Sequence, residues 1–423
     1  MPVPPSPPLL FRHAEQLLTL AGPPAPHRGR DLGEIGIVPR GSVLTGGGKI
    51  LQVGTAGDLD AEARRLKARI IDCRGRVVMP GFVDSHTHLV FAGSRVEDYE
   101  SRLRGKNYEE IAAAGGGIRL SVRMLRDASI SKLVAQARHF LDQFAAHGTT
   151  TVEVKSGYGL DFTNEMKTLQ VVRQLQRHST IELVPTLLAA HVLPAEYAGR
   201  ANAYVALLIE KLIPEVARKK LAEYVDCFCD RGAFSIAECR RVLKAGLRHG
   251  LLPRVHAEQL TRTGASRLAV QLGAASADHL DCVTAAETRA LARSHVVATL
   301  LPGSNFHLGL QRYVPARRLI EAGAIIALAT DFNPGTSPTL NMQMILSIAC
   351  AALRLTPAEA ISAATLNAAY ALRRAHRLGS LEPGKQADLV VMDLDDYRKI
   401  PYYFGVNHCV MAVKAGRIIY QDR

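Results

Sequence analysis

Short apolar runs rich in β-branched residues alternate with longer segments of helical spacing through the middle of this 423-residue chain. The runs cover residues 77–84, 149–155, 181–190, 224–229, 252–257, 275–279, 296–301 and 324–330. The segments between them, such as 131–147 and 163–178, have apolar side chains three and four positions apart. A buried strand followed by a helix, repeated eight times over about 250 residues, predicts an α/β protein with a (β/α)8 barrel.

An open, doubly wound parallel sheet is the alternative that the same alternation allows. Sheets of that kind that bind nucleotides carry a glycine motif directly after a strand. Gly115–Gly117 does not follow a predicted strand, and Gly46–Gly48 lacks the Gly-Lys-Ser/Thr of a phosphate-binding loop. We therefore interpret both glycine runs as ordinary loops and favour the closed barrel.

The two ends of the chain depart from this alternation. Short strands separated by glycine turns are expected at residues 37–55, 70–78, 387–393 and 410–421. Because the ends of a domain usually lie close together, these strands predict one small β-sandwich built from both termini. The expected domains are the two parts of this composite β-domain, 1–76 and 377–423, and the barrel, 77–376.

Composition excludes several classes of protein. With 48% hydrophobic and 22% charged residues, the chain can bury a large core. Its seven cysteines include no Cys-x-x-Cys pair, which argues against a disulfide framework or a thiolate metal site. The proline-rich residues 1–8 predict an extended start without the features of a signal peptide, and no apolar run reaches the roughly 20 residues that span a bilayer. We therefore expect a cytoplasmic protein.

The net charge of +13 raises nucleic acid, an anionic membrane or a small anionic ligand as partners. Nucleic-acid binding requires clustered basic residues with interleaved aromatic residues. Basic runs such as Arg218–Lys220 and Arg373–Arg374 are short, aromatic residues make up only 5% of the chain, and there is no tryptophan. We expect a small-molecule partner, with neither nucleic acid nor a membrane.

Histidines gather where the predicted strands end. His86 and His88 close the first strand, and side chains two apart on an extended chain point the same way. Further potential ligands follow later strands: His191, His256, His279 and Asp331. In a barrel the carboxyl ends of all strands surround one mouth, where active sites are built, so these residues are expected to converge there. Their convergence predicts a metal site.

Several imidazoles with one carboxylate suit Zn²⁺, with iron as the neighbouring possibility. Three or four protein ligands with one open position define a catalytic site, because a bound water loses its proton near neutral pH there. The reaction class that these residues indicate is metal-assisted hydrolysis.

Longer motifs carry a resemblance to a known family. Pro80–His88, together with His256, His279 and Asp331, resembles the amidohydrolase superfamily, whose members are metal-dependent (β/α)8 hydrolases with a β-sandwich from both termini. Four further motifs, 88–95 (HLVFAGSR), 152–159 (VEVKSGYG), 276–280 (SADHL) and 329–335 (ATDFNPG), resemble one branch of that family. The resemblance implies hydrolysis of a ring C–N bond of 4-imidazolone-5-propanoate, giving N-formimidoyl-L-glutamate, in histidine degradation.

The resemblance also implies roles for particular residues. The ligands of one zinc or iron ion would be His86, His88, His256 and Asp331. The substrate would contact Arg95, Tyr158, His191 and Gln259, with Asn333, Gly335 and Thr336 at the glutamate-like end of the product. An arginine suits the propanoate, because it can bind a carboxylate through two parallel hydrogen bonds. A homodimer is implied as well.

The expected mechanism starts with the metal polarising the ring carbonyl and activating a water. His279, beside the metal, orients that water or accepts its proton, and Asp331 carries the proton to the departing ring nitrogen. Gln259 is expected in the catalytic site too, although some relatives have a carboxylate there and a glutamine cannot move a proton. Either Gln259 only forms hydrogen bonds, or Glu258 or His279 supplies the acid-base function.

The sequence leaves two other functions to consider. Another mononuclear amidohydrolase, such as a purine or cytosine deaminase, would use the same metal residues, and only Arg95, Tyr158 and His191 argue against it. A catalytically inactive scaffold would lack ligands, yet all are present. One metal is expected, since the chain has no lysine where binuclear relatives place a carbamylated one; Lys155 lies on the second strand instead.

Overall fold

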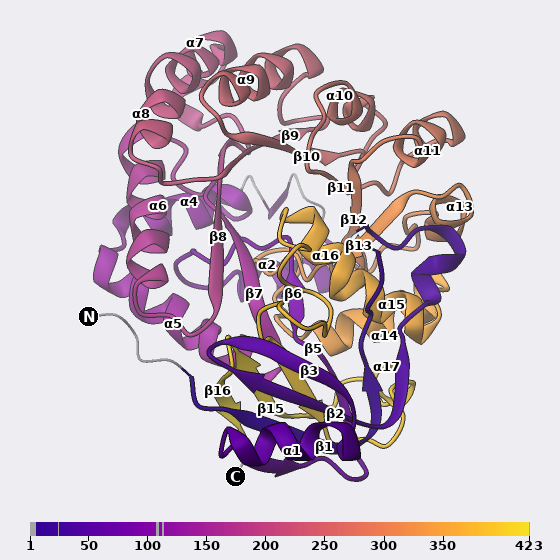
Figure 1. Ribbon diagram of the computed structural model, residues 1–423. Coiled ribbons are helices and arrows are strands. Elements are labelled where there is room, and N and C mark those ends of the chain that lie inside the picture. The colour runs from indigo at the N-terminus through magenta and orange to yellow at the C-terminus, as the bar shows by residue number, and fades with distance from the viewer. Residues whose placement is uncertain (1–5, 24, 107–109, 112–113, 423) are drawn as a thin grey trace.

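The computed structural model describes residues 6–23, 25–106, 110–111 and 114–422 (Figure 1). Eight parallel strands pair in sequence order to form the barrel: β6 (Phe82–Asp84), β7 (Thr149–Lys155), β8 (Glu182–Ala190), β9 (Tyr224–Cys229), β10 (Leu252–Ala257), β11 (Ser276–His279), β12 (Val297–Leu300) and β13 (Ile325–Leu328). For β7 to β13 the predicted bounds are right to within two residues. The predicted barrel is confirmed.

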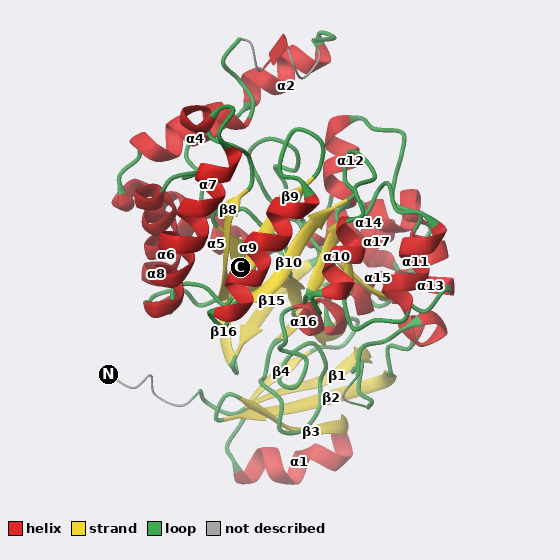
Figure 2. Cartoon of the chain, turned by 90° about the horizontal axis from the view of Figure 1, so that it is seen from above, coloured by secondary structure: helices red, strands yellow, loops and turns green. Residues whose placement is uncertain are grey.

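The helices of this part of the chain lie around the barrel, as their spacing predicted, and beyond one of its ends (Figure 2). They are α2 (Val96–Leu103), α4 (Ile118–Asp127), α5 (Ile130–Ala146), α6 (Phe162–Gln176), α7 (Ala201–Leu207), α8 (Ile213–Arg218), α9 (Ile236–Arg248), α10 (Ala265–Gln271), α11 (Ala285–Ala292), α12 (Pro302–Leu308), α13 (Ala316–Glu321), α14 (Met342–Leu353), α15 (Pro357–Ala364) and α16 (Leu366–Ala371). In α5 the Ser129 hydroxyl accepts the Lys132 N–H at the first turn, and the buried face continues through Leu133, Ala137 and Leu141. Gly148, with φ +89°, then turns the chain into β7.

The barrel closes between its first and last strands just beyond their carboxyl ends. The Asp331 N–H donates to the His86 carbonyl at 3.0 Å, and the His88 N–H donates to the Phe332 carbonyl at 2.9 Å. The Asp84 carboxylate reinforces this seam by accepting the Thr330 N–H at 3.1 Å and hydroxyl at 2.5 Å. The backbone bonds that close the barrel therefore also bring three of the predicted metal ligands together.

The terminal strands form a second, mixed sheet that includes residues from both ends of the chain. It contains β1 (Leu9–Leu18), β2 (Ile37–Gly46), β3 (Lys49–Thr55), β4 (Arg69–Asp72), β5 (Val77–Pro80), β14 (Leu389–Met392), β15 (Cys409–Lys414) and β16 (Arg417–Gln421). Two short helices, α1 (Ala56–Arg65) and α17 (Lys399–Tyr402), lie in the same parts of the chain. The predicted β-domain from both termini is confirmed, and we keep its boundaries at 76/77 and 376/377 as a proposal.

Two features of this sheet differ from the sequence-based expectation. Residues 77–84 are not one barrel strand: β5 belongs to the terminal sheet and β6 to the barrel, because the chain crosses between them at Gly81, whose Cα lies against Thr150. The strand β1 was missed although it pairs with β2, β4 and β5. A bulge at His13, with φ +60°, interrupts its alternation. Of the extended start expected for residues 1–8, residues 1–5 lie outside the described part of the chain.

The terminal sheet lies at the end of the barrel opposite α2 (Figure 2). The glycine runs lie outside regular structure as predicted, except that Gly46 ends β2: Gly47 and Gly48 form the turn to β3, and Gly115–Gly117 precede α4. Within the described part of the chain, no helix is both long and apolar enough to cross a membrane.

An ion network joins the lower end of the barrel to the terminal sheet. Glu182, at the start of β8, pairs with Lys414 of β15 at 3.1 Å and with Arg377, and Lys414 also pairs with Asp388 at 2.6 Å. Burial alone would raise the pKa of Glu182, but Lys414 and Arg377 outweigh it and lower the pKa to about 2. The charge of Glu182 therefore stabilises the contact between the two domains.

Replacing Glu182 by glutamine is expected to destabilise the protein in a pH-dependent way. Because the pKa falls on folding, the charge contributes fully above about pH 5, and its contribution is lost as the pH falls towards 2. The expected loss at neutral pH is up to about 3 kcal/mol. Denaturant unfolding of both proteins at several pH values measures it. A difference that stays constant down to pH 2 would contradict the charge-based explanation.

Candidate active site

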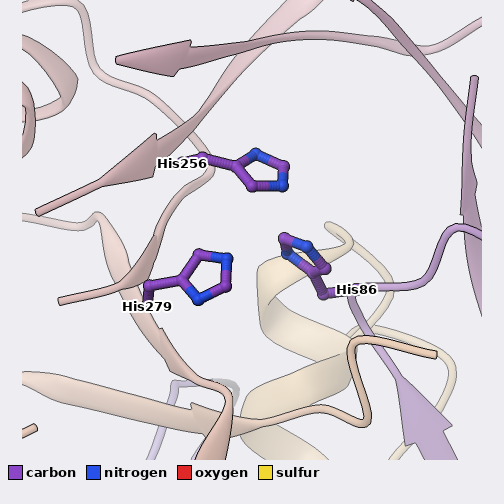
Figure 3. A group of neighbouring side chains, drawn as sticks. All are labelled: His86, His256 and His279. Atoms are coloured by element: carbon purple, nitrogen blue, oxygen red, sulfur yellow. The ribbon is translucent and has the colours of Figure 1, made fainter. Parts of the chain in front are cut away.

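The predicted ligands converge at the carboxyl ends of the barrel strands. His86 and His88 follow β6, His256 lies in β10, His279 ends β11 and Asp331 follows β13. The rings of His86, His256 and His279 point towards a common centre (Figure 3). The centroids of the His86 and His256 rings are 4.6 Å apart, and those of His256 and His279 are 5.4 Å apart. The convergence that the barrel implied is present.

The spacing of these side chains suits a metal ion. Two overlapping groups have ligand atoms within 4.8 Å of one another, His86 with His256 and His279, and His86 with His88 and Asp331. The Nε2 atoms of His86 and His88 are each 3.5 Å from Oδ1 of Asp331. Ligand atoms about 2.1 Å from a tetrahedral zinc ion lie about 3.4 Å apart, so the donors already have the spacing of a coordination sphere.

Two carboxylates orient two of the imidazoles. Nδ1 of His86 is hydrogen-bonded to Asp278 at 2.7 Å, and Nδ1 of His256 lies 3.1 Å from Asp226, an ion-pair contact without the angles of a hydrogen bond. A proton on each Nδ1 leaves a lone pair on Nε2, which is the form that ligates a metal. Both Nε2 atoms are buried and without a hydrogen-bond partner. Such unsatisfied acceptors are costly unless a cation takes them, so these residues fit a metal ion.

Beneath the imidazoles lies a set of charged residues that we call the interior charge cluster: Glu153, Lys155, Asp226, Arg254 and Asp278. All five side chains are completely buried. With Asp331 the cluster carries four formal negative and two formal positive charges, and buried charges must be compensated. The excess of two negative charges is what a divalent cation would balance. Asp84, whose pKa burial raises to about 7, adds at most a fractional charge near neutral pH.

Burial also sets the protonation of the imidazoles. It lowers the pKa of His86, His88 and His191 well below the usual value, and that of His279 to about 3. Burial raises the pKa of Asp331, and His279 partly offsets this. These four imidazoles are therefore neutral at physiological pH, as metal ligation and proton acceptance both require.

Two strand ends have left-handed backbone that redirects their side chains. His279 has φ +77° and Glu258 has φ +50°. Along β11 Asp278 faces the barrel interior, so regular alternation would turn His279 outward; the left-handed residue keeps it in the site. At β10 the same break directs the Glu258 carboxylate to the Ser266 N–H, 3.0 Å away at the first turn of α10. Because its carboxylate is bound there, Glu258 is not a candidate for the acid-base function that Gln259 cannot supply.

Gln259 follows on the loop after β10 and is half-buried. Among the described residues its side chain forms no hydrogen bond, while its carbonyl accepts from the Cys282 thiol at 3.5 Å. The side chain is therefore free to bind a ligand at the mouth of the barrel.

The proposed carboxylate-binding arginine is held between the first turn of α2 and the loop of Gly335. The Nε of Arg95 lies 3.2 Å from Asp98, which also accepts the Gly117 N–H at 2.8 Å. The guanidinium lies against Gly335, where a Cβ would come within 2.2 Å of the Arg95 Cζ. The absence of a side chain at Gly335 creates the space that the guanidinium occupies.

Asn333 organises the loop that carries Gly335. Its Oδ1 accepts the N–H groups of Gly335 at 2.8 Å and of Thr336 at 2.7 Å, and its Nδ2 donates to the Asp331 carbonyl at 2.6 Å. Both ends of the amide are therefore used within the loop. Asn333 would therefore help to bind a substrate only indirectly, through the shape of this loop and the position of Thr336.

Replacing Gly335 by alanine is expected to displace the Arg95 guanidinium and raise KM about 10- to 100-fold, the value of a charged hydrogen-bonded contact. The change in kcat should be smaller, because the histidines are untouched. Steady-state kinetics measures the two parameters separately. Gly57→Ala is the matched control, since Gly57 in α1 has open space around it. An unchanged KM in the Gly335 variant would show that the position of Arg95 does not matter for binding.

The side chains of His88, His191 and Tyr158 form one wall of the site. The rings of His88 and His191 stack with centroids 5.2 Å apart, and Tyr158 lies 5.7 Å from His191. The Gly157 carbonyl, 3.0 Å from Nδ1 of His191, can only accept a hydrogen bond, which leaves Nε2 of this histidine as an acceptor. Burial raises the pKa of Tyr158, so its hydroxyl stays protonated and can donate.

Glu165 fixes the loop that carries Tyr158. Its buried carboxylate accepts the N–H groups of Gly159 and Leu160, both at 2.8 Å, and of Gly157 at 3.2 Å. This residue, Asp98 and the interior charge cluster were missed or left without a role in the sequence analysis. A usable signal exists for the cluster, because Glu153, Lys155 and Asp226 are charged residues within strands that are otherwise apolar.

Comparison with known proteins agrees with this site. A model of the amidohydrolase family matches residues 77–419, and the chain therefore belongs to that family. Imidazolonepropionases match nearly the full length: that of Geobacillus thermodenitrificans (strain NG80-2) is 46% identical over 418 residues, covering 98% of each chain. That of Solibacter usitatus (strain Ellin6076) is 45% identical over 409 residues, covering 97% of this chain and 98% of the relative. Within the family the chain groups with these cyclic amide hydrolases.

Solved structures share the fold at much lower identity. Guanine deaminase of E. coli has a TM-score of 0.74 at 15% identity, covering 98% of this chain and 99% of the deaminase. An adenosine deaminase from Xanthomonas campestris with bound zinc has a TM-score of 0.66 at 20% identity, covering 99% of this chain and 94% of the other. At such identities the likeness concerns the architecture alone.

Proposed function

We propose that this site opens the ring of 4-imidazolone-5-propanoate by adding water across a C–N bond, giving N-formimidoyl-L-glutamate. The observation that carries the proposal is the pairing of a buried His and Asp donor set with a guanidinium held at the loop of Gly335. The donor set suits hydrolysis, and the guanidinium suits a carboxylate chain. The imidazolonepropionase relatives support the same substrate.

One Zn²⁺ or iron ion would be held by His86, His88, His256 and Asp331. When bound, it supplies a Lewis acid that polarises a carbonyl and lowers the pKa of a water to about 7. Two carboxylate-oriented imidazoles and the 3.5 Å contacts of Asp331 support this ligand set. Asp226, Asp278 and Glu153 are each paired with Lys155 or Arg254, which compensates their charges without a second ion and supports one ion per chain.

The remaining residues would bind the substrate and move protons. Arg95 binds the propanoate, and the wall of Tyr158 and His191 holds the ring by contact and hydrogen bonds. The neutral His279 orients the attacking water and accepts its proton as the new C–O bond forms. Asp331 passes that proton to the ring nitrogen as the C–N bond breaks, which balances the reaction. Gln259 contributes hydrogen bonds only.

The decisive experiment incubates the purified protein with 4-imidazolone-5-propanoate and follows the loss of the ring's ultraviolet absorbance. We expect turnover that stops after chelation and returns when Zn²⁺ or iron is added. Ammonia release from guanine, adenine or cytosine, measured in parallel, tests the deaminase alternative that shares the metal residues. Absence of chelator-sensitive ring opening would refute the proposal, and ammonia release would favour the alternative.

We also propose that two copies of the chain associate. Large apolar side chains are exposed together beside a cavity of about 720 Å³, among them Phe306 (57% exposed), Tyr402 (73%) and Phe404 (72%). An exposed apolar surface of this kind is typical of an interface. Sedimentation should give twice the chain mass of 45.8 kDa, and Phe404→Glu should shift the protein towards the monomer. A monomer at micromolar concentration would contradict this proposal.

A further inference from the structure

Lys155 occupies the centre of the interior charge cluster. Its Nζ lies 2.8 Å from Asp226, 2.9 Å from Glu153 and 3.8 Å from Asp278. The side chain is completely buried, so water cannot compensate its charge. The hydrogen bonds of Nζ both go to carboxylates, those of Glu153 and Asp226, so we assign Lys155 no part in the hydrolytic step itself.

Each carboxylate partner of Lys155 supports a different piece of the predicted metal site. Asp226 uses Oδ2 for both Lys155 and Nδ1 of His256. Asp278 likewise uses Oδ2 for both Lys155 and Nδ1 of His86. Glu153 binds Lys155 through Oε1, and through Oε2, 3.1 Å away, it accepts the Thr87 N–H between His86 and His88. Three of the four predicted ligands are therefore supported by groups that converge on one ammonium.

We propose that Lys155 is a positioning residue that holds these three carboxylates in the arrangement that presents His86, His88 and His256 to the metal. The three carboxylates share one water-free interior, where like charges repel strongly. The ammonium offsets this repulsion and fixes where each oxygen lies. Arg254 shares part of this task, since its guanidinium lies 3.5 Å from Asp278 and 3.9 Å from Glu153, but it is anchored to the Ser85 carbonyl at 2.7 Å, and Asp226 pairs with Lys155 instead.

Loss of the ammonium should act first on the metal. Without it, the three carboxylates would repel one another and move apart, and His86 and His256 would lose the oxygens that face their Nδ1 atoms. Groups that orient metal-binding histidines typically contribute 10- to 100-fold in metal affinity. We expect Lys155→Met, which keeps the shape and removes the charge, to release the ion about 10- to 100-fold faster to a chelator. The inference rests on the proposed metal site but not on the proposed substrate.

The experiment loads the full-length protein with Zn²⁺ and follows its transfer to a chromogenic chelator. Lys414→Met is the matched control, since Lys414 also pairs with two carboxylates, Asp388 and Glu182, but at the other end of the barrel. Both variants should lose stability, and only Lys155→Met should release zinc faster. Equal release rates in Lys155→Met and the wild type would overturn the inference. Failure of the wild type to bind zinc would instead refute the metal site.

A second variant decides the matter if Lys155→Met does not fold. Lys155→Arg keeps a positive charge in the interior, but a planar guanidinium cannot place one donor centre among three carboxylates. Faster zinc release than from the wild type, by several-fold, is expected and supports the positioning role. Release at the wild-type rate would show that any buried positive charge suffices, and would contradict the inference.

Discussion

Replacing His279 by alanine is expected to lower kcat by about 10²- to 10⁴-fold, the contribution of a positioned acid-base group. The ring of His279 lies beside those of His86 and His256. His279 differs from these two ligands because its backbone is left-handed and because it directly follows Asp278 on β11. The metal content should therefore stay at one ion per chain. Single-turnover kinetics and elemental analysis of the same preparation measure the two quantities.

The control for this variant is His376→Ala, which changes an exposed histidine distant in sequence from the site. Its kcat and metal content should match those of the wild type. If His279→Ala loses the metal together with activity, then His279 is a ligand, as its group with His86 and His256 would also allow. If activity persists within a few-fold of the wild type, the proton is moved elsewhere and the mechanism fails.

Replacing Asp331 by alanine is expected to remove both metal and activity. Oδ1 of Asp331 lies 3.5 Å from the Nε2 atoms of both His86 and His88, so its loss removes a donor shared by two of the proposed ligands. We expect metal binding to weaken by more than 10²-fold, because even groups that only orient a ligand contribute 10- to 100-fold. Titration with zinc against a competing chelator measures this affinity.

A partial recovery of turnover at millimolar zinc would agree with this explanation, because the three histidines remain. Asp395→Asn, on the exposed surface, is the control and should bind zinc like the wild type. If Asp331→Ala kept a full complement of tightly bound metal and lost only turnover, Asp331 would be a proton carrier without a ligand role. That result would also make His279 the fourth ligand.

The barrel could be predicted almost in full from the sequence, because its strands are buried and follow one another regularly. The strands from β7 to β13 were placed to within two residues. The convergence of the histidines then followed from the fold alone, since the ends of parallel strands share one edge. The fold placed five histidines and Asp331 at this edge, and the choice of His86, His88, His256 and Asp331 as ligands among them came from the family resemblance.

What the sequence could not provide depends on local breaks in regular geometry. Alternation predicts that Glu258 shares the face of His256 and that His279 turns away from Asp278, and left-handed backbone at both positions reverses this. The bulge at His13 hid β1 in the same way. Left-handed backbone costs a non-glycine residue about 1–3 kcal/mol, which tertiary contacts must offset, and no local sequence pattern predicts where this happens.

The pairing of buried charges was equally out of reach. Glu153, Lys155 and Asp226 are visible in the sequence as charged residues within apolar strands. Which of them meet depends on the register between β7, β8 and β9, which pattern reasoning does not give. The contacts within the interior charge cluster therefore follow from the register of these strands and not from the sequence pattern of any one of them.

The seam between the first and last barrel strands has a consequence for how the molecule holds together. Asp84 and Thr330, which meet there, are 246 positions apart in the chain, so the seam closes the largest loop in the barrel. A cation bound by His86, His88 and Asp331 would link the end of β6 to the end of β13 at that point. Closing so long a loop restricts the unfolded chain more than any local contact can. The metal ion of the reaction would then also act as a cross-link between the first and last strands. Its loss would let the barrel begin to open at the place where catalysis occurs.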